Sequence, residues 1–177
     1  MKITTKTEEQ VVNKDVSNYI DKDKCIFYGV MKRISETKGV FDTLKDALKS
    51  TPIKIVRPMN SEDLGGFIIN AFDKRTRALI RQKIYNTAFS EFYLCESVGD
   101  EYNIGVNVKT FATYVKQAGP NDIITWYIDK DNTDELVFVF WNPTRRVNNT
   151  RKLKLYNIEE EIIKIPDTDW SCKIGLC

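Results

Sequence analysis

Hydrophobic and polar positions along the chain follow two different periods. Two segments place apolar residues every three or four positions, which is the spacing of a helix with one buried face. These segments are residues 38–50, KGVFDTLKDALKS, and residues 106–119, VNVKTFATYVKQAG. Gly119 and Pro120 mark the end of the second segment, because Gly accepts a left-handed cap and Pro cannot continue a helix. The pattern therefore predicts two amphipathic helices.

Shorter stretches rich in Ile, Val, Phe and Tyr lie between turns of Gly, Pro and charged residues, which is typical of β-strands. We expect strands at residues 25–34, 53–58, 65–72, 78–85, 89–95, 102–106, 122–130, 135–142 and 150–157. The core then reads as a strand, a helix and three strands, written twice, although the sequences of the two halves do not match. Two helices and eight or nine strands indicate an α+β domain, with both helices on one side of an antiparallel sheet.

The two ends of the chain differ from this core. Residues 1–24 are polar and mixed in charge, and we interpret them as a flexible N-terminal extension. Residues 25–157 hold the predicted helices and strands and form one domain. Residues 158–177 contain no turn signal before Pro166 and end in a strand-like stretch, SCKIGLC. We interpret this last segment as a connector that leads into the start of a missing second domain.

The composition removes several classes of function. The 177 residues include no His, which excludes Ser-His-Asp and Cys-His catalysis and every His-dependent zinc site. The four Cys show no metal-ligand spacing, so we expect reduced thiols in an intracellular protein. No apolar run approaches about 18 residues and no secretory leader opens the chain, so we expect neither membrane insertion nor secretion. With a net charge of +2, contact with nucleic acid must come from a local patch.

One acidic cluster supports two interpretations. Asp129, Asp131, Asp134 and Glu135 are carboxylates of the kind that hold Mg²⁺ in a nuclease. The same spacing, rich in Asp and Asn, is typical of a hairpin turn, and we favour that interpretation. We therefore expect no catalytic residue, no metal and no cofactor.

Lysines recur on the polar faces of both predicted helices. Lys45 and Lys49 share a face of the first helix, and Lys109 and Lys116 share a face of the second. Ammonium groups on flexible stems suit contact with phosphate without base readout. An ordinary solvated helix face gives the same pattern, so this spacing alone does not establish DNA binding.

Several stretches resemble, in order, the proliferating cell nuclear antigen family of DNA sliding clamps. They are TLKDALK at 43–49, GFIINAFDKRTRALI at 66–80, Ala118-Gly119, DIIT at 122–125, the hairpin from Asp134 to Phe138, and Ile165-Pro166 followed by Trp170-Ser171-Cys172. Together they extend the resemblance from Ile26 to Cys172. The last of them matches the signature of the connector between the family's two domains, and this chain holds one such domain and the connector.

The resemblance implies a clamp fold, with helices lining the hole of a homotrimeric ring and sheets outside. It implies a polymerase processivity factor without catalysis, which encircles double-stranded DNA, is opened by a clamp loader, and tethers DNA polymerase and other clamp-binding-motif proteins of replication and repair. The place of action would be the nucleus or an intracellular, including viral, replication site. A checkpoint clamp or a viral transcription accessory factor with the same fold is the alternative.

The resemblance also implies three sets of site residues. Nonspecific DNA contacts fall on Lys45, Lys49, Lys109 and Lys116. The pocket for client peptides falls on Phe72, Thr76, Arg77, Leu79, Ile163, Ile165 and Pro166. Thr76 and Arg77 replace a His and a small apolar residue of the family, which predicts a more polar and more positive rim. The interface between subunits falls on Arg151, Lys152, Leu153, Lys154, Leu155 and Tyr156, in an edge strand whose alternating residues predict one buried and one exposed face.

Overall fold

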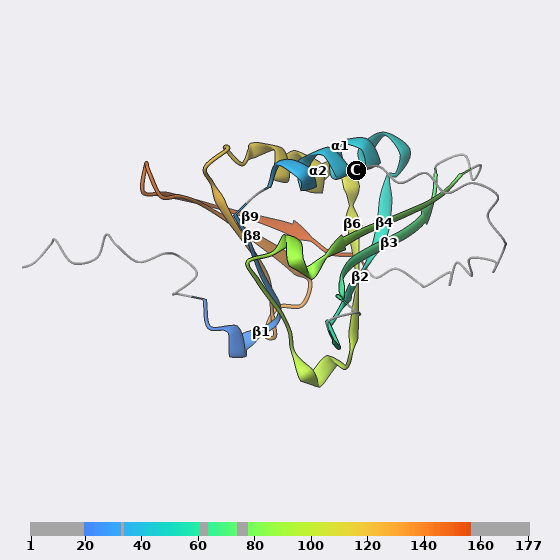
Figure 1. The fold of residues 1–177 in the computed structure, drawn as a ribbon, viewed down its shortest axis with the longest axis horizontal. Coiled ribbons are helices and arrows are strands. Elements are labelled where there is room, and N and C mark those ends of the chain that lie inside the picture. The colour runs from blue at the N-terminus through green and yellow to red at the C-terminus, as the bar shows by residue number, and fades with distance from the viewer. Residues whose placement is uncertain (1–19, 33, 61–63, 74–77, 157–177) are drawn as a thin grey trace, which may run out of the picture.

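The computed structural model describes residues 20–32, 34–60, 64–73 and 78–156 (Figure 1). Its helices are α1 (Ser35–Ala47) and α2 (Val108–Gln117), and its short 3₁₀ turns are η2 (Lys22–Lys24), η3 (Asn86–Ala88) and η4 (Glu96–Val98). Its strands are β1 (Cys25–Met31), β2 (Ser50–Val56), β3 (Gly66–Phe72), β4 (Leu79–Tyr85), β5 (Glu91–Leu94), β6 (Glu101–Asn107), β7 (Ile123–Asp129), β8 (Glu135–Asn142) and β9 (Val147–Lys154). None of the helices in these ranges is long and apolar enough to span a membrane.

The strands form two antiparallel sheets, as the clamp resemblance implied, although the apolar pattern alone indicated a single sheet. Their strand orders are β5-β1-β7-β8-β9 and β4-β3-β2-β6. Each helix carries the chain from one sheet to the other, since α1 connects β1 to β2 and α2 connects β6 to β7. The first strand of the first half, β1, therefore lies in the sheet of β7, β8 and β9. The corresponding strand of the second half, β6, lies in the sheet of β2, β3 and β4. This exchange, rather than a single continuous sheet, joins the two halves of the α+β domain.

A single core fills the space between the helices and the two sheets. The rings of Phe41 in α1 and Phe111 in α2 lie with their centroids 4.0 Å apart. Phe111 also contacts Trp126 of β7 and Phe138 of β8, and Trp126 contacts Phe67 of β3. All five side chains are fully buried, and burial of each contributes roughly 1.5–3 kcal/mol. The core fixes which face of each helix points inward and so leaves the polar faces outside.

The two helices lie side by side and antiparallel on one side of the molecule (Figure 1). Near the start of α1, Lys38 Nζ donates to the carbonyl of Ala118, just beyond the end of α2. At the opposite ends, the amide of Val108 donates to the carbonyl of Lys49 over 3.1 Å. These contacts hold both ends of the pair, so the polar faces of α1 and α2 form one continuous surface.

The first helix was predicted at residues 38–50, and the structure places α1 three residues earlier at both ends, with its last residue at Ala47. This helix begins at Ser35 rather than Lys38, and Ile34 at its N-cap makes no side-chain hydrogen bond, so no capping residue marks the start. At α2, the side chain of Asn107 caps the helix by accepting from the amide of Thr110 over 3.0 Å. The start of α2, which has a recognisable cap residue, was therefore predicted more closely than the start of α1, which has none.

Strand β9 is shifted from its predicted position. It occupies Val147–Lys154 instead of residues 150–157, because residues 143–146 complete a tight turn in which Arg146 adopts a φ of +53°. Beyond the strand, Leu155 donates from its amide to Asp134, and Tyr156 donates to Gly105 of β6 in the other sheet over 2.9 Å. Tyr156 therefore connects the two sheets, whereas Leu155 extends the pairing of β9 with the start of β8. Only the first four of the six predicted interface residues lie in β9.

Candidate nucleic-acid interface

The polar faces of α1 and α2 enclose a hollow on the helix side of the molecule. Its lining comes from both helices and consists of Lys45, Asp46, Lys109, Ala112, Thr113 and Lys116. Three of the four lysines predicted to contact DNA thus lie around one depression. The fourth, Lys49, is exposed in the short connection between α1 and β2. The antiparallel arrangement of the helices brings these lysines together, although they are far apart in the sequence.

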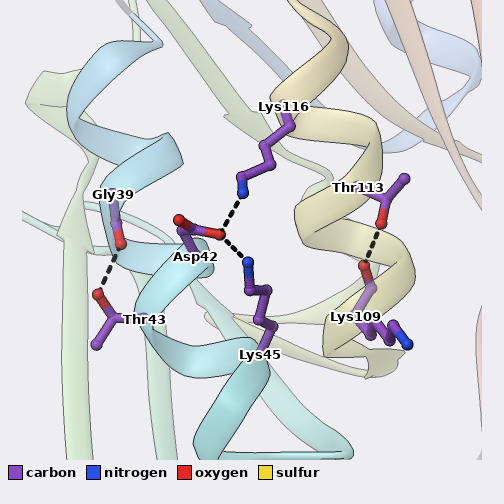
Figure 2. Close-up of polar contacts among 7 residues, drawn as sticks. All are labelled: Gly39, Asp42, Thr43, Lys45, Lys109, Thr113 and Lys116. Atoms are coloured by element: carbon purple, nitrogen blue, oxygen red, sulfur yellow. Dashed lines mark hydrogen bonds and ion pairs between the residues drawn. The ribbon is translucent and has the colours of Figure 1, made fainter.

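An aspartate lies between two of these lysines, as Figure 2 shows. The ammonium groups of Lys45 and Lys116 both donate to Oδ1 of Asp42, and the Lys116 contact measures 2.6 Å. Lys116, followed by Lys45, holds the pKa of the Asp42 carboxyl below its ordinary value. In turn, Asp42 raises the pKa of Lys45. Through these two contacts the Asp42 carboxylate joins the two helices.

The contact between Asp42 and Lys116 was not predicted from the sequence. The spacing of Asp42 and Lys45, three positions apart on one helix, is a signal for the pair within α1. Nothing in the sequence indicates that Lys116 reaches the same oxygen, because that depends on how α2 packs against α1.

Lys49 and Lys109 differ from Lys45 and Lys116, which are both bound to Asp42. Lys49 and Lys109 are exposed, and neither forms an ion pair in the part of the chain that the structure describes. Lys109 is drawn in Figure 2 beside Thr113, whose hydroxyl donates to the Lys109 carbonyl over 2.8 Å. Since that hydroxyl donates to its own helix, the ammonium groups are the main donors that the hollow offers to an anion.

The helix face carries only a modest positive charge. Lys45, Lys109 and Lys116 on the helices, Lys49 just beyond α1, and the two aspartates Asp42 and Asp46 give this surface a formal charge of +2, four positive charges less two negative ones. This balance suits weak contact with a polyanion and does not suit a tightly held, sequence-specific complex.

Two residues of the predicted client pocket lie within the described residues. Phe72 ends β3, Leu79 begins β4, and the two face each other across the hairpin. Phe72 is 46% exposed and so offers apolar surface at the end of this hairpin. Thr76, Arg77, Ile163, Ile165 and Pro166 lie outside the described residues.

The predicted interface strand buries one side chain, and most of its other side chains are exposed. Leu153 is buried in the core, whereas Lys152 and Lys154 are exposed on either side of it in the sequence. Lys152 forms an ion pair with Glu135 of β8 over 2.9 Å. Strand β9 lies at the end of its sheet, with β8 on one side and no strand of the described residues on the other. On that outer edge, the carbonyl of Lys152 accepts from the hydroxyl of Tyr114 in α2 over 3.4 Å.

The acidic cluster lies at the turn between β7 and β8. Asp129 accepts from the amide of Asp131 over 2.8 Å, and Glu135 accepts from Asn132 and Lys152. These are contacts of a hairpin turn. Within the described ranges, no three acidic or Cys side chains are arranged to share a metal ion.

Comparison with known families identifies the fold. Residues 29–162 match the model of the proliferating cell nuclear antigen N-terminal domain. The match covers more than half of the chain and includes both helices and strands β2–β9. The chain belongs to this family. The resemblance seen in the sequence is therefore confirmed, as is the α+β clamp fold of two helices on antiparallel sheets.

Proposed function

We propose that this chain is a domain of a DNA sliding clamp, a non-catalytic processivity factor that encircles duplex DNA and tethers replication and repair enzymes. The observation that carries the proposal is the gathering of Lys45, Lys109 and Lys116 around one hollow, on the two helices of a clamp-family domain. In a ring, these helices would face the DNA and the sheets would form the outer surface.

The chemistry of the helix face supports nonspecific contact with phosphate. Duplex DNA carries one negative charge per roughly 1.7 Å of its axis, so the ammonium groups can contact a phosphate at every position of the ring along the duplex. Flexible lysine side chains make point contacts with phosphate and carry no base preference. A ring that is closed around DNA needs no strong contact to stay bound, and weak contact allows it to slide.

Other surfaces would serve assembly and partner binding. The outward backbone edge of β9 would pair with a neighbouring domain and so extend the sheet across a subunit boundary into a homotrimeric ring. DNA polymerase and other proteins with a clamp-binding motif would place an apolar anchor near Phe72 and Leu79. A clamp loader would open the ring.

Duplex binding by the chain tests the DNA part of this proposal. We expect equal affinity for two duplexes of unrelated sequence, and a linear fall of log affinity with log salt concentration. Replacing Lys45, Lys49, Lys109 and Lys116 together by Ala should weaken binding to both duplexes equally. A preference for one sequence, or an unchanged affinity of the quadruple variant, would contradict the proposal.

A nuclease assay with Mg²⁺ tests the non-catalytic part. We expect no cleavage of single-stranded or duplex DNA above the background of a matched Asp131→Asn preparation. Cleavage that depends on Mg²⁺ and disappears in the Asp131→Asn variant would instead support the acidic cluster as a metal site.

A further inference from the structure

Two of the four lysines on the helix face already hold an anion. The ammonium groups of Lys45 and Lys116, from two different helices, converge on a single oxygen of Asp42 (Figure 2). An oxygen of a backbone phosphate would make the same charge-assisted contacts between the same two groups. Asp42 therefore occupies, from within the chain, a position that suits a DNA phosphate.

We propose that Asp42 is an internal counter-anion, which competes with DNA phosphate for Lys45 and Lys116 and so weakens the grip of the helix face on the duplex. This inference rests on the proposed function. As a consequence, Lys49 and Lys109 can contact phosphate without breaking an ion pair. Lys45 and Lys116 must first release the carboxylate of Asp42.

The exposure of the cluster allows such an exchange. The side chains of Asp42 and Lys116 are 44% and 50% exposed. Ion pairs with this much access to water contribute little, because solvent and salt screen them. A duplex that presents several phosphates at once can therefore displace a single carboxylate, and the carboxylate can return when the phosphate moves on.

The alternative role for Asp42 is to hold the two helices together. Other contacts already do so, since Phe41 packs on Phe111 in the core and Lys38 binds the carbonyl of Ala118. The helix pair therefore does not depend on Asp42. The two roles predict opposite results, because loss of a needed tie weakens DNA binding whereas loss of a competitor strengthens it.

The test compares duplex binding by wild type, Asp42→Asn and Asp131→Asn over a range of salt concentrations. Asp131→Asn makes the same change in net charge in the exposed β7–β8 turn. We expect Asp42→Asn to bind about three- to tenfold tighter than Asp131→Asn at 50 mM salt, with a log–log salt slope steeper by up to about 1.8, because two more lysines then release counterions from phosphate. Adding Lys45→Ala and Lys116→Ala to Asp42→Asn should abolish the gain.

A second measurement does not depend on any substitution at Asp42. In wild type, the ammonium NMR signals of Lys45 and Lys116 should shift when duplex is added, as the partner changes from carboxylate to phosphate. Unshifted signals for these two lysines at saturating duplex would overturn the proposal, as would equal affinity of Asp42→Asn and Asp131→Asn.

The result also separates this inference from the proposed function. If the quadruple Lys→Ala variant binds duplex as wild type does, the proposed function is wrong. If that variant binds more weakly but Asp42→Asn behaves like Asp131→Asn, the proposed function stands and only the role of Asp42 is wrong.

Discussion

The helix face and the β9 edge are both basic, yet their lysines stand in different surroundings. On the helices, Lys109 and Lys116 project from the first and last turns of α2, where no strand edge is offered and the Asn107 side chain and the backbone of Ala118 supply the caps. On β9, Lys152 and Lys154 flank a strand whose outer backbone edge faces away from its sheet. The helix face thus offers charge alone, whereas the edge also offers a row of backbone donors and acceptors.

This difference assigns separate tasks to similar residues. A surface that offers charge suits duplex DNA, whose evenly spaced phosphates can be contacted at any position along the helix. A strand edge suits another strand, and its lysines discourage pairing with the wrong one. The count of basic residues is similar in the two regions, so composition does not distinguish them and the secondary structure does.

The largest expected effect is a loss of stability when the buried side chain of β9 is replaced. Leu153 is 3% exposed and faces Leu136 across β8 and β9. Leu153→Asp would bury an unpaired carboxylate, so we expect a loss of about 3 kcal/mol or more in the free energy of unfolding. Lys154→Ala, one position along on the exposed face, should change it by less than about 0.5 kcal/mol. Urea unfolding measures both, and equal losses would refute the assigned faces of β9.

The next effect concerns an apolar site, which should bind its partner by burying apolar surface and thus differ from both basic surfaces. Phe72→Asp should weaken binding of a conventional clamp-binding peptide to this protein by at least about tenfold, as expected for loss of an apolar contact at the centre of an interface. Tyr85→Asp is a matched control, because Tyr85 is also 46% exposed and lies at the other end of the same hairpin. Titration calorimetry should show that this binding changes little with salt. Equal weakening by the two variants would exclude a local site at Phe72.

The smallest expected effect is on acid stability. Because Lys116 and Lys45 lower the pKa of Asp42, the carboxylate contributes stability above its ordinary value of 3.8 and loses that contribution as the pH falls through the lowered value. Asp42→Asn lacks the contribution at every pH. The small difference in unfolding free energy between wild type and this variant should therefore stay constant from neutral pH down to about 3.8 and shrink as the pH falls further. A difference that persists in acid would contradict this linkage.

The sequence predicted elements well and their pairing poorly. The apolar spacing of Phe111, Ala112 and Val115 located α2. The apolar run at 136–141, between a Glu and an Asn, located β8 with the observed bounds. The exchange of β1 and β6 between sheets was not predictable from single segments, since every strand is apolar enough to pair with several others. Likewise, lysine spacing placed Lys109 and Lys116 on one face, but the carboxylate between Lys45 and Lys116 depends on tertiary packing.

The contrast between the two basic surfaces is tested most directly by a matched pair of double variants. Lys49→Ala/Lys109→Ala removes two charges from the helix face, and Lys152→Ala/Lys154→Ala removes two from the β9 edge. Duplex binding is measured for both against salt concentration. We expect the helix-face variant to flatten the log–log slope by about 1.8, and the edge variant to leave it close to wild type. Equal flattening by both variants, or a larger effect from the edge variant, would contradict the assignment of DNA contact to the helices.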